Sequence, residues 1–237
     1  ARRAGPGQAL SMGLLHTLYE GLLPQLVIFD LDGTLLDSVP DLAAAVDQML
    51  ARRGREPAGV ERVKDWVGNG SYVLVRRALA GSPDHSAVDN AEADHAHQDF
   101  LHAYAGEHRL TAVYPGVQAL LDWLQGQGVA MAVATNKPER FVAPLLQEKG
   151  LGGYFSWLVG GDTLPAQKPD PIALNWIMQQ AGRKVEETLF VGDSRNDVLA
   201  ARAAGMKVVA VSYGYNHGEP IAAQNPDLLV DSLDALI

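Results

Sequence analysis

The stretch that decides the fold is LVIFDLDGTL, residues 26–35. Its first part, residues 26–31, is apolar except for Asp30 and does not alternate with polar residues, which is typical of a parallel strand buried on both faces. Two acids, Asp30 and Asp32, stand at the end of that run, and Gly33 allows a sharp turn after them. An Asp-Gly turn is common, but it does not explain Asp30, because an unpaired acid is costly in an apolar strand. The stretch therefore predicts functional carboxylates at the carboxyl end of a strand, where ligands bind in open α/β sheets.

Further short apolar runs of the same kind follow along the chain. They lie at residues 129–135, 155–160, 188–193, 207–212 and 227–230. Segments with apolar residues at helical spacing lie between them, at residues 117–124, 140–148, 171–180 and 196–204. This alternation of strands and helices predicts a doubly wound, Rossmann-like α/β core with a parallel sheet.

Residues 39–112 interrupt the alternation, because they carry only helical patterns. Leu42, Val46 and Met49, for example, fall on one helical face. We therefore expect an all-α helical module, inserted into the sheet domain after the first strand. Pro40 and the Tyr-Pro-Gly turn that begins at Tyr114 are the expected hinges.

The expected domain boundaries follow from these patterns. The α/β core takes residues 25–38 and 113–237, and the helical module takes residues 39–112. Residues 1–24 contain Arg2 and Arg3 near their start, followed by a short apolar run broken by polar side chains. We expect this first segment to be a tail or lead-in outside the fold rather than a signal peptide.

Composition narrows the class of protein. Apolar residues make up 47% of the chain and charged residues 20%, as in ordinary globular proteins. The net charge of −9 differs from the basic charge that is typical of nucleic-acid-binding proteins. It would also repel an anionic substrate, which would therefore need a local cation or metal. There is no cysteine, which excludes disulfides and thiol chemistry and fits a reducing, cytoplasmic location. No apolar stretch reaches the length of a membrane span. From the charge we expect no nucleic-acid partner, and from the lack of such a stretch we expect no membrane partner.

More polar residues stand at or after the ends of the predicted strands, one of them a lysine in a loop. They are Thr135, Lys168, Asp193 and Asp197. Each one alone has an ordinary structural explanation: a strand-ending threonine, a loop lysine before a proline, and acids that cap the following helix or oppose its dipole. Their placement along one sheet edge, together with Asp30, favours a catalytic function.

The motifs resemble, in order, those of the haloacid dehalogenase-like hydrolases. The matching segments are FDLDGTLLDS (29–38), ATNK (134–137), QKPD (167–170) and GDSRND (192–197). The resemblance implies a phosphatase in which Asp30 is the nucleophile that forms an aspartyl-phosphate and Asp32 is the general acid and base. An acid at position 32 favours phosphate esters over the other substrates of the family, because a leaving alkoxide needs a proton.

The resemblance also implies Mg²⁺ as the cofactor. Its ligands would be Asp30, the backbone carbonyl of Asp32, and Asp193, with Asp197 beside the metal. A hard cation prefers oxygen ligands and offsets the repulsion between a carboxylate and a phosphate. The phosphoryl group would then be held by Gly33, Thr135, Asn136 and Lys168.

Several segments resemble the bacterial phosphoglycolate phosphatases, a branch of this family. They include WVGNG (66–70), TNKP (135–138) and YGYN (213–216). This resemblance implies a small-molecule phosphate ester, 2-phosphoglycolate, as the substrate. In the helical module, the expected substrate contacts are Asn69, Gly70 and Arg76, whose guanidinium could bind the carboxylate through two hydrogen bonds. For Arg76, a solvated helix face is the alternative.

Three alternative functions stay open. One is a broad-specificity sugar-phosphate phosphatase, and another is a phosphosugar mutase, which returns the phosphate from Asp30 to the sugar. A non-catalytic binding protein that keeps the fold is the third, and the full set of acids together with Lys168 disfavours it. The sequence indicates no particular oligomeric state.

Overall fold

The computed structural model describes residues 12–237, and its centre is a sheet of six parallel strands. The strand order is β5-β4-β1-β6-β7-β8. The strands are β1 (Leu26–Phe29), β4 (Ala130–Ala134), β5 (Trp157–Val159), β6 (Thr188–Gly192), β7 (Lys207–Val211) and β8 (Leu228–Val230). Each predicted apolar run contains one of these strands, so the doubly wound, Rossmann-like sheet is confirmed.

Helices cover both faces of the sheet. The α-helices are α6 (Val117–Gly126), α7 (Val142–Glu148), α8 (Ile172–Ala181) and α9 (Arg195–Ala204), and the short 3₁₀ helices are η1 (Glu139–Phe141), η2 (Val185–Glu187), η3 (Ile221–Gln224) and η4 (Leu233–Leu236). Successive side chains of a strand point to opposite faces. Val27 and Phe29 therefore pack in the cluster with α6 and α7, whereas Leu26 and Ile28 pack with α8 and α9.

The order of the strands places a switch point at β1. After β1 the chain adds β4 and β5 on one side, then crosses back to add β6, β7 and β8 on the other. Connections on the two sides run in opposite directions, which leaves a crevice at the carboxyl ends of the central strands. The ends of β4, β1 and β6 meet at this crevice.

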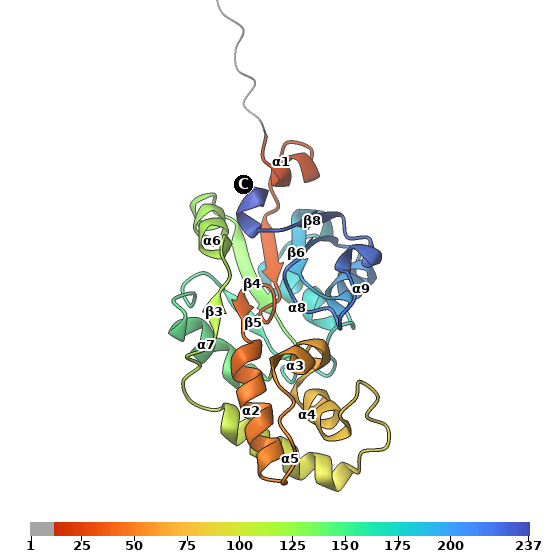
Figure 1. Ribbon diagram of the computed structural model, residues 1–237. Coiled ribbons are helices and arrows are strands. Elements are labelled where there is room, and N and C mark those ends of the chain that lie inside the picture. The colour runs from red at the N-terminus through yellow and green to blue at the C-terminus, as the bar shows by residue number, and fades with distance from the viewer. Residues whose placement is uncertain (1–11) are drawn as a thin grey trace, which may run out of the picture.

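The helical module consists of four α-helices. They are α2 (Val39–Ala51), α3 (Val60–Trp66), α4 (Ser71–Ala80) and α5 (Asn90–Tyr104). They share an apolar cluster of their own, which also includes Phe141 and Tyr215 from the core. Figure 1 shows these helices gathered at one end of the molecule, with α1 and the C-terminus at the opposite end. No helix in the described part of the chain has the length and apolar character needed to cross a membrane.

The chain enters and leaves the helical module through two short strands that the sequence did not reveal. Strands β2 (Leu36–Asp37) and β3 (Ala112–Val113) pair in antiparallel fashion. Pro40, expected as a hinge, instead lies in the first turn of α2, where proline is tolerated because its missing N–H has no helical partner. A pair of two-residue strands is too short to show a period in sequence.

The segment expected to be a lead-in outside the fold lies partly in the core. Residues 1–11 fall outside the described residues, but α1 (Leu14–Leu18) packs against η4. Leu15 is 1% exposed and belongs to the main core cluster. The Tyr19 hydroxyl donates a hydrogen bond of 3.0 Å to the carbonyl of Thr188. The core therefore extends further toward the N-terminus than residue 25.

Candidate active site

The site lies where β1, β4 and β6 end side by side. Asp30 follows β1, Thr135 follows β4 and Asp193 follows β6, and the parallel register brings these ends to one edge of the sheet. Lys168 comes from the loop between β5 and α8. These four side chains, with Asp32, line one cavity between the core and the helical module.

Lys168 is the cation at the centre of this cavity. Its Nζ lies 3.1 Å from Asp30 Oδ1 and 2.6 Å from Asp197 Oδ1, and its side chain is 3% exposed. Burial alone would lower the pKa of Lys168, but the two carboxylates outweigh burial and raise it. Lys168 therefore stays a cation at neutral pH, next to two carboxylates in the cavity.

A cluster of three buried acids surrounds this lysine. Asp30, Asp193 and Asp197 each offer a carboxylate oxygen, and these oxygens lie within 4.8 Å of one another. Burial, followed by the charge of Asp197, raises the pKa of Asp30 to about 7, although Lys168 opposes the shift. Burial and the charges of the other two acids raise the pKa of Asp193 well above its ordinary value.

The chemistry of this cluster fits a divalent cation. Three carboxyl groups face one ammonium group, so the fully ionised cluster carries excess negative charge, and burial together with this charge raises the pKa values of Asp30 and Asp193. A hard cation such as Mg²⁺ takes oxygen ligands and would offset the charge. The residues present can therefore hold a metal of this kind.

Asp197 differs from the other two acids because its oxygens are already used. Its Oδ1 accepts from Lys168, and its Oδ2 accepts from the backbone N–H groups of Asp193 and Ser194 at 3.0 and 3.1 Å, and from the Ser194 hydroxyl at 3.2 Å. Burial would raise the pKa of Asp197, but Lys168 and these donors lower it. Asp197 thus positions Lys168 and caps α9, and it is the least available metal ligand of the three.

Asp193 keeps a single orientation through contacts with two loops. Its Oδ1 accepts 2.9 Å from the Thr34 hydroxyl, and its Oδ2 accepts 2.7 Å from the backbone N–H of Tyr215. Gly33 passes close to it with φ +83°, where a Cβ atom would lie 2.1 Å from Asp193 Oδ2. Only glycine permits this approach.

Asp32 forms a second lysine–carboxylate pair, which the sequence analysis missed. Lys137 Nζ lies 3.1 Å and 3.3 Å from the two Asp32 oxygens, and the Lys137 side chain is 3% exposed. The Ser38 hydroxyl donates to Asp32 Oδ1 at 2.5 Å. Lys137 stands two positions after the strand-ending Thr135, and its place in the ATNK segment was the one signal that pointed to it.

Thr135 and Asn136 lie in the cavity as expected, but Asn136 holds other parts of the protein. The Thr135 hydroxyl accepts a 3.1 Å bond from the backbone N–H of Lys137 and is free to donate. The Asn136 amide donates to the carbonyls of Lys168 (2.9 Å) and Gly68 (3.0 Å), and its oxygen accepts from the Lys168 N–H (2.9 Å). Asn136 thus fixes the Lys168 loop against the helical module.

Two expected substrate contacts are corrected by their hydrogen bonds. The Gly33 N–H donates to the carbonyl of Leu36 at 2.8 Å, so Gly33 serves the site through close approach to Asp193 rather than by cradling phosphate. Arg76 does not line the cavity. It is 8% exposed, and its guanidinium donates to the His85 ring and carbonyl, to the Asn90 side chain and to the Val88 carbonyl. Arg76 holds a loop of the helical module.

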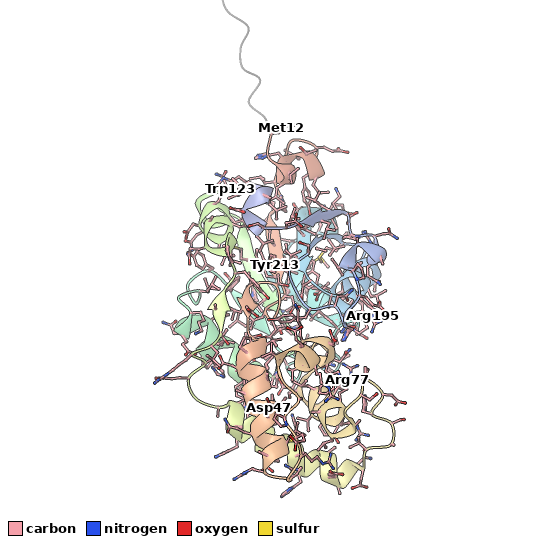
Figure 2. The ribbon with its side chains drawn as sticks, viewed as in Figure 1. Met12, Asp47, Arg77, Trp123, Arg195 and Tyr213 are labelled. Atoms are coloured by element: carbon pink, nitrogen blue, oxygen red, sulfur yellow. The ribbon has the colours of Figure 1, made fainter. Side chains whose placement is uncertain are left out.

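The loop of residues 66–70 meets the core through its backbone. Gly70 lines the cavity, whereas the Asn69 side chain accepts a 3.0 Å bond from Arg77 and its carbonyl accepts a 2.9 Å bond from Gln167. Asn69 is thus a bridge between the module and the core rather than a cavity residue. Figure 2 shows Arg77, in the module, on the same side of the molecule as Arg195, in the core, and the charge of Arg195 contributes to lowering the pKa of Arg77, after burial.

The module side of the cavity is mostly apolar. It is formed by Leu42, Val67, Leu74 and Phe100, with Phe141 from the core beside them. Tyr104, at the end of α5, adds a hydroxyl to this wall that sequence reasoning did not foresee. The amphipathic pattern of α5 predicts which face is buried but not which core residues it meets.

Comparison with known proteins identifies the family of this chain. The family model of the haloacid dehalogenase-like hydrolases matches residues 24–205. The chain belongs to the haloacid dehalogenase-like hydrolases.

Within that family, three similar proteins are named as phosphoglycolate phosphatases. The phosphoglycolate phosphatase of Pseudomonas fluorescens strain Pf0-1 is 63% identical over 226 residues, which cover 95% of this chain and 83% of the relative. Phosphoglycolate phosphatase 1 of Pseudomonas aeruginosa is 62% identical with the same coverage, 95% and 83%. Among solved structures, a predicted phosphoglycolate phosphatase from Haemophilus somnus superposes with a TM-score of 0.82 at 36% identity, covering 89% of this chain and 95% of that one.

Proposed function

We propose that this protein is a Mg²⁺-dependent phosphoglycolate phosphatase, which hydrolyses 2-phosphoglycolate to glycolate and inorganic phosphate. The observation that carries the proposal is the buried cluster of Asp30, Asp193, Asp197 and Lys168 at the switch point of the sheet. The relatives named phosphoglycolate phosphatase, at 60% identity and above over most of the chain, support the choice of substrate.

In the first half of the reaction, an Asp30 carboxylate oxygen attacks phosphorus. The bond from phosphorus to the ester oxygen breaks, and the leaving glycolate alkoxide takes a proton from Asp32. Lys168 and the Thr135 hydroxyl stabilise the charge on the phosphoryl oxygens. When held by Asp30, Asp193 and the Asp32 carbonyl, Mg²⁺ would supply the positive charge that lets an anionic nucleophile approach an anionic phosphate.

In the second half, water hydrolyses the aspartyl-phosphate. Asp32, now ionised, takes a proton from the water as its oxygen bonds to phosphorus. The bond between phosphorus and Asp30 breaks, which frees phosphate and restores both carboxyl groups to their starting states. The apolar wall of the helical module limits access to other water, so that the water next to Asp32 is the one that reacts.

The test is phosphate release from 2-phosphoglycolate beside a panel of sugar phosphates, with Mg²⁺ and then with chelator. We expect a strong preference for 2-phosphoglycolate that disappears on chelation, and no turnover by Asp30→Asn. Equal turnover across the panel would keep the Asp30 mechanism and refute the substrate. Undiminished activity of Asp30→Asn would refute the mechanism.

A further inference from the structure

Lys137 and Tyr104 are in contact at the cavity, and neither takes part in the proposed attack on phosphorus or the hydrolysis that follows. Lys137 comes from the loop after β4, and Tyr104 ends helix α5 of the helical module. The Lys137 ammonium lies 4.6 Å from the centre of the Tyr104 ring. The two side chains therefore form a contact between core and module at the wall of the site.

The Tyr104 hydroxyl is a buried polar group without a partner. Tyr104 is 3% exposed, and its hydroxyl makes no hydrogen bond within residues 12–237. A buried hydroxyl normally has a partner, because leaving it unpaired is costly. Its ring is held by Phe100, stacked at 5.7 Å, and by Phe141, edge-on at 5.0 Å, so it cannot simply turn away. Tyr104 lines the cavity, and its hydroxyl is thus a donor held in one place at the cavity wall.

Lys137 has donor capacity left for a ligand. An ammonium group carries three N–H donors, and the Asp32 oxygens accept at most two of them. Burial would lower the pKa of Lys137, but Asp32 outweighs it and the pKa is raised. Burial raises the pKa of Tyr104 to about 12, so its hydroxyl stays a donor at neutral pH.

The position of this pair relative to Asp32 indicates what it would bind. Asp32 is the group assigned to protonate the leaving oxygen, and in 2-phosphoglycolate a single methylene separates that oxygen from the carboxylate. A cation in contact with Asp32 therefore lies within reach of that carboxylate. Lys168, the other cation lining the cavity among the described residues, is committed to Asp30 and Asp197 on the phosphoryl side.

We propose that Lys137 Nζ and the Tyr104 hydroxyl bind the substrate carboxylate and so determine the preference for a carboxylate-bearing ester. This inference rests on the proposed function and deepens it. A sugar phosphate would place a hydroxyl-bearing carbon where the Lys137 ammonium favours an anion. The carboxylate would also take the free donor of Lys137, which links substrate recognition to the residue that holds Asp32.

The test compares 2-phosphoglycolate with 2-hydroxyethyl phosphate, in which a neutral alcohol replaces the carboxylate. For Tyr104→Phe we expect a loss in kcat/KM of roughly tenfold for 2-phosphoglycolate only, and for Lys137→Met a selective loss of roughly a hundredfold on top of any loss common to both. Tyr72→Phe is the matched control, because its hydroxyl donates to Asp94 outside the cavity. A control that lost the preference would also overturn the inference.

A binding measurement separates recognition from catalysis. By calorimetry, the affinity for 3-phosphonopropionate, a non-hydrolysable analogue with the carboxylate, should fall in both variants, whereas the affinity for propylphosphonate should not. If kcat/KM fell equally for the two substrates and the affinity for 3-phosphonopropionate did not fall, Lys137 would serve only Asp32. That result would overturn this inference but not the proposed function. Wild-type protein without preference for 2-phosphoglycolate would overturn the proposed function as well.

Discussion

Replacing Asp197 by asparagine should destabilise the metal-free protein, whereas replacing Asp193, four positions earlier in the same motif, should stabilise it. Asp197 accepts a 2.6 Å bond from Lys168 and three further hydrogen bonds. It is therefore a counter-ion of the buried Lys168 ammonium. In Asp197→Asn, one oxygen becomes an NH₂ group that must face either the ammonium or the N–H donors of Asp193 and Ser194. Breaking a buried ion pair by removing one partner costs about 3–5 kcal/mol.

Asp193→Asn should behave differently. The Asp193 carboxylate is buried and is repelled by Asp30 and Asp197, so its charge is unfavourable in the metal-free protein, and asparagine removes that charge. The asparagine oxygen can still accept from the Tyr215 N–H, and its NH₂ group would face the Thr34 hydroxyl, which can turn and accept. We therefore expect a higher free energy of unfolding than that of the wild type.

The assay is chemical and thermal unfolding with chelator at pH 8. A loss of 3–5 kcal/mol in Asp197→Asn corresponds to a melting temperature lower by roughly 10 °C for a chain of this size. Adding Mg²⁺ should stabilise the wild type and Asp197→Asn but not Asp193→Asn, because Asp193 is the better ligand. The reasoning is refuted if Asp193→Asn is the less stable of the two in chelator.

Three further outcomes follow from the site. Burial raises the pKa of Asp30 to about 7 and also raises the pKa of Asp193, and both carboxyls must lose their protons before Mg²⁺ binds, so we expect the affinity measured by calorimetry to fall by at least roughly tenfold per pH unit below 7; a flat profile would contradict this. Gly33→Ala would push a Cβ atom into Asp193 Oδ2, and we expect a roughly 10²-fold loss of kcat; activity within tenfold of wild type would argue against the close approach. Arg76→Ala removes four hydrogen bonds and should lower the free energy of unfolding by about 3 kcal/mol, without changing the ratio of kcat/KM for 2-phosphoglycolate and 2-hydroxyethyl phosphate; a selective rise in KM would restore Arg76 to the site.

The sequence was sufficient for features that depend on local pattern. Buried parallel strands require continuous apolar runs, so each run could be located from its residues, and an acid such as Asp30 at the end of one stands out because burial is costly there. The ends of adjacent parallel strands share one sheet edge. For that reason Asp30, Thr135 and Asp193 could be grouped before their distances were known.

The features that the sequence could not reveal depend on contacts between distant segments. Arg76 looked like a substrate contact because nothing in its helix shows that the carbonyls of His85 and Val88 surround it. Lys137 received no role from the sequence, because its partner Asp32 lies 105 positions away. The packing of α1 against η4 joins the two ends of the chain, and no local pattern announces it.

The site contains two lysine–aspartate pairs with different roles. One pair serves the attack on phosphorus, and the other serves the choice of substrate. Lys168 with Asp197 stands on the phosphoryl side, and Asp30, the other ion-pair partner of Lys168, also comes from the core. Lys137 with Asp32 stands on the leaving-group side, where the wall is completed by Tyr104 from the helical module. Changes in the module should therefore alter which ester is accepted while leaving the attack on phosphorus intact. The insertion after β1 is well placed for this, because it begins directly after the loop that carries Asp30 and Asp32 and ends beside it through the β2–β3 pair.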